Sequence, residues 1–441
     1  MNTREGSSGL KWLNVAGLGI AFAISGNFSG WNFGLGLGGW GGMVAASVVM
    51  ACFYLCLSQC VAELGAAHPQ AQGMDSYAGY GLGRAGSYFA GMSVAIAVGF
   101  AAGAGCNFIE AYCTAVLGAG GLPLKLVLVA VLVAVQLRGA REAVTLTAAG
   151  GLFSVIVLLL FCAAMLPHFS VAGLYSQRQG AATVFPHGAY GVIECIPYAL
   201  FMFFGVEQAA NAVGDMHQPG RNLPKALLAA VGVILALGSA VLVLATGGGG
   251  IARVALADGN PLYVAMGGPG LANLGWLGTA VGAGSIVSLV STVFSMTYSG
   301  SRQLYSLAQS GLLPARLART NGRGAPVNAL YVVGAFALAG MAIDANTVLV
   351  CFIFSVSVCN VLVLVSFMRL RRMQPDLPRP YRAIGGTRTA ATALALSLVV
   401  LLACAGLQPA ALAYVALAYA SCGLHYLTLT RTRSARVAGT E

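Results

Sequence analysis

The stretch ECIPYALFMFFGVEQAANAVGDMHQPGRNLPK, residues 194–225, decides the fold, because it begins as a membrane helix and then departs from that pattern. Gly205, the carboxylate of Glu207 and the amide of Asn211 fall where the middle of a bilayer is expected. A charge at that depth costs at least about 2.5 to 3.5 kcal/mol on insertion scales, so an intramembrane glutamate indicates a functional site by default. The alternative is a glutamate that is buried and hydrogen-bonded to a neighbouring helix for packing only.

The composition places the whole chain in a membrane. Of its 441 residues, 58% are apolar and 8% are charged, against about 25% charged in an ordinary soluble domain. The 60 glycines fit helices that approach one another closely in a bilayer. The 11 cysteines lie in apolar segments without a CxxC pair, so we interpret them as small hydrophobic residues and expect no metal site and no cofactor.

Twelve apolar segments are candidates to span the bilayer, which needs about 17 to 25 residues each. The first segment runs on directly into the second, so we expect no cleaved signal peptide. The expected spans are 12–38, 40–66, 85–118, 122–137, 143–166, 188–215, 224–247, 273–300, 327–342, 346–367, 387–407 and 410–430.

The basic residues predict the orientation of these spans. All but three of the 23 lysines and arginines, namely all except Lys125, Arg178 and Arg253, fall on the side of the N-terminus. The positive-inside rule therefore predicts that both termini are cytoplasmic. The net charge of +11 follows from this topology, and no nucleic-acid partner is expected, because the basic residues form no stripe with interleaved aromatics. The basic segment 369–388 is expected to contact membrane lipid at the inner leaflet.

A second interruption lies in the first span, where residues 25–30 read SGNFSG. Backbone that leaves a helix at membrane depth is tolerated only where it lines a cavity or is buried in protein. Interrupted spans at corresponding positions of two halves indicate an inverted-repeat transporter that holds its substrate between the broken helices. We therefore expect a first five-helix repeat at 12–166, an inverted second repeat at 188–367, and two additional helices at 387–430.

Several longer signatures occur in order along the chain. They are ISGNFSGWNFGLGLGGWGG in the first span, Glu63-Leu64 before His68-Pro69, IPYALFMFFGVEQAANAVGDMHQPGRNLPKAL across the sixth, GSRQLYSLAQSGLLPARLARTNGRGAPVNAL after the eighth, and LRRMQPDLPRPYR before the eleventh. With these segments the chain resembles the amino acid, polyamine and organocation permease superfamily, and within it most closely the bacterial ethanolamine permeases. The subfamily resemblance depends mainly on SGNFSGWNFG and on Glu207-Gln208. The chain departs from many relatives at Gly214-Asp215 and at Met74-Asp75.

The resemblance implies an all-α fold of twelve helices in a five-plus-five inverted repeat, and alternating access across a bacterial inner membrane. It also implies that substrate contacts the unwound parts of spans one and six together with spans three, eight and ten. The candidate substrate-binding residues are Ser25, Gly26, Asn27, Phe28, Ser29 and Gly30 in span one, Asn107 and Glu110 in span three, and Phe204, Gly205, Glu207 and Asn211 in span six.

Two further groups of polar residues need an interpretation. Glu110 shares one helical face with Asn107 and is expected to be the second deeply placed carboxylate. Glu194 is expected nearer the outer surface, as a gate or structural residue. The hydroxyl stripe of span eight is typical of helix joining, but Ser291 and Thr292 are also candidate ligands for a coupling cation.

These residues lead to a permease for a small amine, ethanolamine first, because an alkylammonium group needs acceptors and negative charge, which Glu207 and Glu110 supply. Its hydroxyl would use Asn27 or Ser25. The alternative is an amino acid permease, in which N–H groups of the broken first helix bind a carboxylate.

Coupling is left open between a proton carried by Glu110 or Glu207, sodium at Ser291 and Thr292, and plain exchange. A sensor protein with the same fold is also compatible with the residues. An enzyme is not expected and no catalytic residue is identified, because the chain has no GxSxG, HExxH or Walker A match and its five histidines are not clustered.

Overall fold

The computed structural model describes residues 10–71, 73–138, 140–178, 181–268, 270–271, 273 and 275–438, and in these ranges it leaves out the side chains of 140–148, 177–178, 181, 211 and 430–438. The described chain is helical apart from one small antiparallel hairpin. Nine of its helices are long and apolar enough to cross a bilayer. The predicted all-α, polytopic membrane class is therefore confirmed.

The first half of the chain forms the helices that the apolar runs predict. Non-helical backbone at Gly39 (φ 70°) separates the first two expected spans, and Gly83 (φ 68°) separates a short helical lead from the third. Only glycine adopts such positive φ angles without strain. The elements are α1 (Trp12–Ala23), the 3-10 turn η1 (Ile24–Asn27), α2 (Trp31–Ala67), α3 (Met74–Leu117), α4 (Leu122–Gln136) and α5 (Ala140–Met165).

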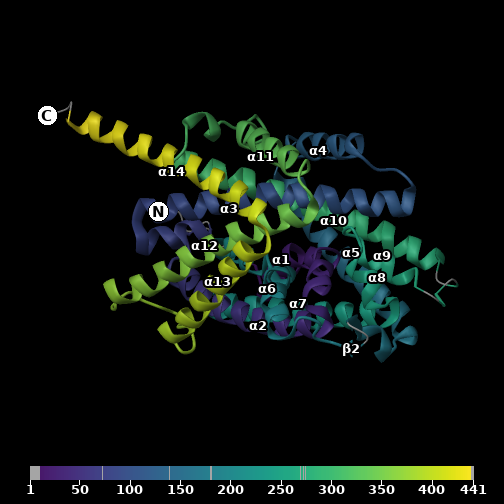
Figure 1. Ribbon diagram of the computed structural model, residues 1–441. Coiled ribbons are helices and arrows are strands. Elements are labelled where there is room, and N and C mark those ends of the chain that lie inside the picture. The colour runs from purple at the N-terminus through teal and green to yellow at the C-terminus, as the bar shows by residue number, and fades with distance from the viewer. Residues whose placement is uncertain are drawn as a thin grey trace.

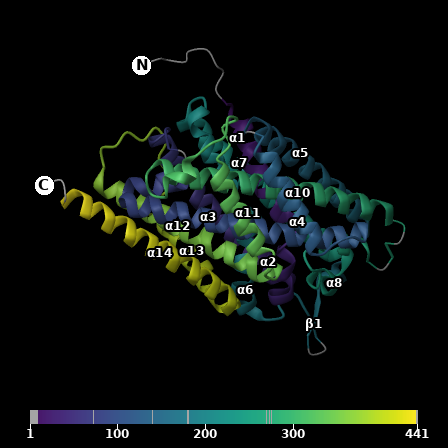
Figure 2. The same cartoon turned by 90° about the horizontal axis from the view of Figure 1, so that it is seen from above.

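A connection at one end of the bundle leads into the second half (Figure 2). It consists of η2 (Leu166–His168), η3 (Val171–Leu174) and the paired strands β1 (Ser176–Arg178) and β2 (Ala181–Thr183). The second half consists of α6 (Gly188–Phe203), η4 (Val206–Asp215), α7 (Pro219–Gly249), α8 (Ile251–Ala255), α9 (Pro261–Met266), α10 (Gly275–Gln309), η6 (Ala315–Ala318), α11 (Val327–Gly340), α12 (Ala345–Met373), α13 (Thr387–Leu407) and α14 (Pro409–Ala438).

Two of the expected spans are short in the structure. α4 has 15 residues and α11 has 14, so each is about 21 to 23 Å long at 1.5 Å per residue, less than the roughly 30 Å of a hydrocarbon core. The two helices lie side by side (Figure 1). The number of twelve spans stays a prediction, and so do the three proposed units at 12–166, 188–367 and 387–430.

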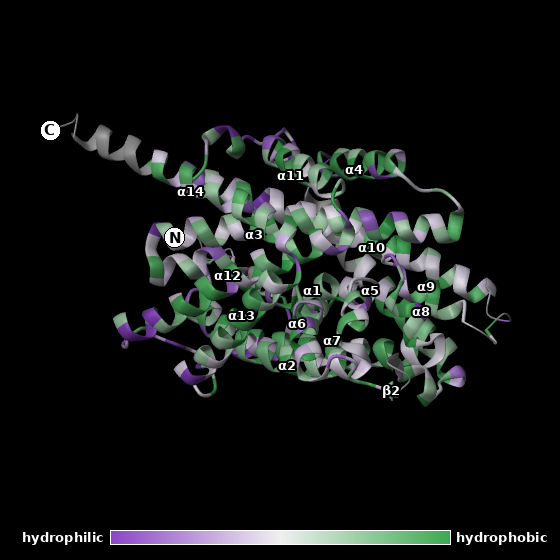
Figure 3. Cartoon of the chain, viewed as in Figure 1, coloured by the Kyte–Doolittle hydropathy of each residue, from purple (hydrophilic) through white to green (hydrophobic). Residues whose placement is uncertain are grey.

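The centre of the molecule is formed by helices that are far apart in sequence. α3 packs against α10 and α12, and α2 packs against α6 and α7. α14 runs along the outside of this bundle (Figures 1 and 2). Hydrophobic residues cover the helices, and hydrophilic ones gather in the connections, most visibly between α12 and α13 (Figure 3).

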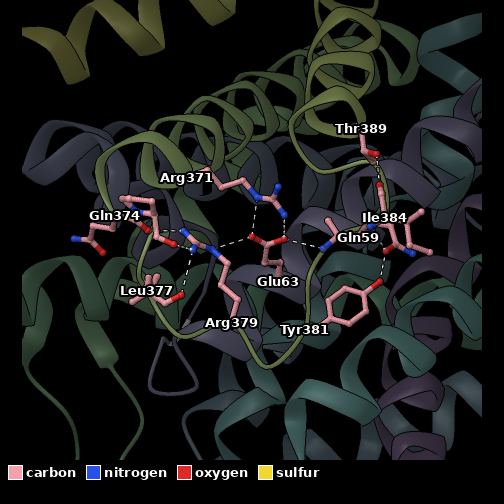
Figure 4. A network of polar contacts seen from close by, with 11 residues as sticks. Gln59, Glu63, Arg371, Gln374, Leu377, Arg379, Tyr381, Ile384 and Thr389 are labelled. Atoms are coloured by element: carbon pink, nitrogen blue, oxygen red, sulfur yellow. Dashed lines mark hydrogen bonds and ion pairs between the residues drawn. The ribbon is translucent and has the colours of Figure 1, made fainter.

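The connection between α12 and α13 is fastened to α2 by one buried carboxylate (Figure 4). Glu63, on the last turns of α2, is 2% exposed. Arg371 donates to it twice, from Nε at 2.9 Å and from Nη2 at 2.5 Å. The Nε of Arg379 lies 3.1 Å from Oε1, the oxygen that also accepts from the Arg371 Nε, and the backbone N–H of Ala383 donates to Oε2 at 2.7 Å. The charge is therefore paired and hydrogen-bonded, as burial requires.

The same connection is held at further points. Arg379 also donates to the backbone carbonyls of Gln374, at 2.8 Å, and Leu377, at 3.1 Å. The phenol of Tyr381 donates to the amide oxygen of Gln59, one turn before Glu63 on α2. Two arginines of the segment that was expected to contact lipid thus bind protein, while its contact with lipid stays a prediction.

We expect that Glu63→Gln lowers the free energy of unfolding by about 3 to 5 kcal/mol, because removal of one partner from a buried ion pair leaves the other charges uncompensated. The measurement is thermal or denaturant unfolding of the purified protein in detergent. Glu194→Gln is the matched control, since Glu194 pairs with a more exposed partner, His187, at 3.1 Å. Equal stability of the two variants would contradict the role assigned to Glu63.

Candidate functional site

The helix break that SGNFSG predicts is present in the first span. α1 ends at Ala23, η1 covers Ile24–Asn27, and Gly30 turns the chain with a φ of 87° before α2 begins. The carbonyls that lose their helical partners are bonded by side chains. The Tyr112 phenol of α3 donates to the Phe28 carbonyl at 2.9 Å, and the Trp31 indole donates to the Asn27 carbonyl at 3.1 Å. The fold therefore stabilises the break, because side chains bond the backbone carbonyls that it exposes.

The far side of this break is tied to the segment between α8 and α9. The Ser29 hydroxyl donates to the Gly259 carbonyl at 2.6 Å, and the Asn32 amide donates to the Ala257 carbonyl at 2.6 Å. Ser29 is thus engaged by protein in this conformation.

The sixth span breaks where Gly205 predicts. α6 ends at Phe203, and Gly205 adopts a φ of 107° before η4 begins. The backbone N–H of Gly205 donates to the Glu207 carboxylate at 3.1 Å, so Glu207 bonds the backbone at the break that precedes it.

The two breaks cross with their backbones in contact. A Cβ atom on Gly26 would lie 2.5 Å from the Phe201 carbonyl oxygen and 2.8 Å from the Met202 Cα. A Cβ atom on Gly205 would lie 2.8 Å from the carbonyl carbon of Phe22. Any larger residue at either glycine would force the two helices apart.

Glu207 faces a small cavity beneath the crossing. The carboxylate is 2% exposed, and in the described part of the chain no lysine, arginine or histidine forms an ion pair with it. The amide Nδ2 of Asn360 is buried there without a hydrogen-bond partner. The cavity of about 10 Å³ has room for about one water molecule and is lined by Met74, Val94, Ala97, Phe204, Glu207, Gln208, Val356, Cys359 and Asn360. Glu207 thus places a carboxyl group at the break, in a conformation too closed for a substrate.

A much larger cavity, which we call the vestibule, lies at the N-terminal end of α12. It has a volume of about 840 Å³. Its lining consists of Phe33, Asn107, Glu110, Ala111, Thr114, Ala115, Lys125, Leu256, Ala257, Asp258, Asn260, Val264, Met341, Ala342, Ile343, Asp344, Ala345 and Asn346.

One ion pair stands in the wall of the vestibule. The Lys125 ammonium lies 3.4 Å from the Glu110 carboxylate and donates to Asn107 Oδ1 at 2.8 Å. The side chain of Glu110 is 28% exposed and that of Lys125 is 15% exposed. The expectation that Glu110 is deeply placed is therefore wrong, because it lies two turns before the end of α3 on an open cavity. Lys125 is not among the predicted site residues, although it is one of only three basic residues predicted to lie outside, which is a signal.

Aromatic rings separate the vestibule from the Glu207 cavity. The first ring lines the vestibule and the last lines the cavity at Glu207. Successive ring centroids lie 6.4, 6.5, 5.7 and 4.6 Å apart in the order Phe33, Phe108, Phe201, Phe352 and Phe204. We call these five rings the aromatic barrier.

Other predicted residues of the first span lie apart from both cavities. Asn27 is fully buried, and neither of its amide atoms has a hydrogen-bond partner. Its Oδ1 faces α7, where a Cβ on Gly238 would approach it to 2.7 Å. Ser25 and Phe28 are buried without lining either cavity. The side chain of Asn211 lies outside the described residues.

The hydroxyl stripe of α10 bonds its own helix. Ser285 and Ser288 each donate at 2.8 Å, and Thr292 at 3.1 Å, to the carbonyl four residues earlier. Ser291 lies against Gly150 of α5. No group of three or more His, Cys, Asp or Glu that could hold a metal ion occurs among the residues described. A cation at Ser291 and Thr292 stays a prediction.

Comparison with known proteins adds a family match. A family model described as amino acid permease matches residues 10–424. A branched-chain amino acid permease of Bacillus subtilis is 24% identical over 236 residues, which cover 53% of this chain and 48% of that protein. A probable polyamine transporter of Arabidopsis thaliana is 27% identical over 178 residues (40% and 36%), and a methylthioribose transporter of Bacillus subtilis is 22% identical over 196 residues (44% and 40%). The chain thus matches less than half the length of each of these relatives.

We expect that Gly26→Leu abolishes uptake in proteoliposomes, because the new side chain meets the backbone of α6 at the crossing. Gly17→Leu is the control, since a Cβ at Gly17 meets nothing within 4 Å. Insertion, followed by the yield of membrane-extracted protein, should be largely retained in both variants. Uptake by Gly26→Leu at the level of Gly17→Leu would refute the role of the close crossing.

Proposed function

Because this chain belongs to the amino acid permease family, whose model matches residues 10–424, we propose that it is a secondary transporter for a small molecule with an ammonium group, an α-amino acid first. Glu207 carries this proposal. It is a buried carboxylate at the break of the sixth span, and no cation pairs with it in the described chain.

An ammonium ion is the chemical partner that such a carboxylate lacks. One of the oxygens of Glu207 accepts the Gly205 N–H, and an ionised carboxylate has about four lone-pair sites in total. A charge-assisted hydrogen bond in a site without bulk water is roughly twice as strong as a neutral one. Asn360, with an unbonded amide Nδ2, and Phe204 border the same cavity. An apolar side chain of the substrate would pack on Phe204.

The vestibule favours an amino acid over a plain amine. Lys125 and Glu110 present opposite charges 3.4 Å apart in its wall. An α-amino acid carries its carboxylate and ammonium on one carbon, so the zwitterion can lie antiparallel to this pair, with carboxylate toward Lys125 and ammonium toward Glu110. A simple amine has no group for Lys125. The vestibule would thus select zwitterions at the first encounter.

Ethanolamine is the second candidate, in line with the resemblance of SGNFSGWNFG and Glu207-Gln208. The observation that favours it is the charge of the vestibule. Three carboxylates, Glu110, Asp258 and Asp344, face one ammonium, Lys125. Excess negative charge in a cleft raises the local concentration of cations. Ethanolamine is cationic at neutral pH, whereas a neutral amino acid gains nothing from this field.

The arrangement of the cavities fits alternating access. The vestibule is open, while the Glu207 cavity is closed behind the aromatic barrier. We place the vestibule outside, the termini in the cytoplasm and the chain in a bacterial inner membrane, from the distribution of its basic residues. In this proposal the units 12–166 and 188–367 are the inverted repeats, and the transport cycle is proton-linked through Glu207 or runs by exchange.

Glu207→Gln keeps the shape of the side chain and deletes its charge. Loss of a desolvated charge partner typically costs about 2 to 5 kcal/mol, so we expect the affinity for the substrate to fall more than tenfold. Binding and counterflow are measured on the purified, reconstituted variant. If Glu207 instead carries a proton, binding and counterflow persist and only pH-driven accumulation is lost. Wild-type affinity, accumulation and pH dependence together would show that the residue is structural.

Lys125→Gln should separate the two substrate classes. Without the ammonium, α-amino acids lose their carboxylate partner, and their competition for uptake should weaken roughly tenfold, as for one charged hydrogen bond. Amines with the same side chain but no carboxylate should compete as before or better. Arg253→Gln is the control, because it removes an external positive charge that does not line the vestibule. Equal loss for both substrate classes would exclude a carboxylate subsite at Lys125.

A further inference from the structure

A third cavity lies where α12 ends and α13 begins, about 40 Å along α12 from the vestibule at 1.5 Å per residue. Its volume is about 300 Å³. Four of its lining side chains are guanidinium groups, and the full lining is Arg371, Arg372, Pro375, Arg379, Arg382 and Thr387. No carboxylate lines this cavity.

The network around Glu63 fixes two of these arginines in place (Figure 4). Arg371 and Arg379 both bind the Glu63 carboxylate, and their Nε atoms share its Oε1. Arg379 is further held by the carbonyls of Gln374 and Leu377. The one negative charge of Glu63 does not balance the four positive charges of the arginines, so the cavity walls carry excess positive charge. Two of these arginines are already held in position before a ligand binds. Like charges around one cavity repel one another, and an anion bound among them lowers this repulsion.

The other two arginines are positioned to reach a ligand. Arg372 and Arg382 are exposed, and in the described chain neither forms an ion pair. Thr387 begins α13 on the rim of the cavity. The positive end of the helix dipole favours an anion at this position. Two fixed and two exposed guanidinium groups therefore line the same cavity as the N-terminus of α13.

We propose that this cavity binds a phosphate group. The planar fork of arginine matches phosphate oxygens in pairs, and several arginines around one cavity suit a group with more than one charged oxygen. The cavity lies at the ends of two membrane-spanning helices, which is the level of lipid headgroups. The phosphate belongs either to an anionic phospholipid in the membrane or to a free phosphate compound in water. The proposal does not depend on which substrate is transported.

A phosphate group bound in this cavity would strengthen the contact that Glu63 of α2 makes with Arg371 and Arg379. An anion that neutralises Arg371 and Arg379 from the cavity side offsets the repulsion that opposes their pairing with Glu63. α12 carries Phe352 of the aromatic barrier and Asn360 of the Glu207 cavity. The bound phosphate would thus stabilise the conformation in which the end of α12 is fixed to α2.

The test uses the full chain, purified in detergent, and its midpoint of thermal unfolding. Dioleoylphosphatidylglycerol, dioleoylphosphatidylcholine and inorganic phosphate are titrated separately, with chloride at equal ionic strength as the salt control. A ligand that binds only the folded state raises the midpoint. The variant Arg372→Ala/Arg382→Ala removes the two reachable arginines without touching the Glu63 network. Arg319→Ala/Arg323→Ala removes the same charge from exposed positions outside the cavity.

We expect phosphatidylglycerol or inorganic phosphate to raise the midpoint of the wild type and of the control variant alike. Whichever of the two acts identifies the source of the phosphate. In Arg372→Ala/Arg382→Ala the half-saturating concentration should rise at least about tenfold, since each charged hydrogen bond contributes roughly 1.5 to 3 kcal/mol. No rise with either phosphate compound overturns the proposal. An equal loss in both double variants also overturns it, because it indicates attraction to the basic surface as a whole.

Discussion

Unpaired backbone at membrane depth is the constraint on which this structure depends. Two helices break at the centre of the bundle, and each break would expose N–H and C=O groups to an apolar medium. The protein meets this constraint with side chains, such as Tyr112 on the Phe28 carbonyl and Glu207 on the Gly205 N–H. Glycines at 26 and 205 then allow the two broken segments to touch. These bonds keep the backbone open at a fixed place, which is where the candidate site lies.

The two ends of α12 handle charge in opposite ways. At the vestibule end, carboxylates outnumber the single ammonium of Lys125, and the space is open. At the other end, arginines outnumber the single carboxylate of Glu63, which is fully buried. Between them lies an apolar stretch with the aromatic barrier and Glu207. The charge at the first end therefore favours cationic solutes, and the charge at the second end favours anionic groups.

The sequence predicted the membrane class, the helix breaks and most helix boundaries, because these depend on local patterns of apolar residues, glycine and proline. The sequence did not predict the surroundings of individual polar side chains, because these depend on how distant segments pack together. Glu110 was judged by its place in an apolar run, yet the bend and length of α3 bring it to an open cavity beside Lys125. Asn27 turns toward α7, which no pattern in the first span indicates. The Glu63 network joins segments 308 residues apart, and its partners are not visible from either segment alone.

The separation of Glu63 from its partners in the sequence has a consequence for the synthesis of the protein. Glu63 leaves the ribosome 308 residues before Arg371, which is about 15 to 60 s earlier at 5 to 20 residues per second. During this interval the carboxylate has no guanidinium partner, so it must stay protonated or remain in contact with water at the membrane edge. The end of α2 can reach its final place only after α12 and the connection that follows it have been made. A contact that fixes the first half of the molecule thus forms only late in synthesis, with two helices, α13 and α14, still to be made.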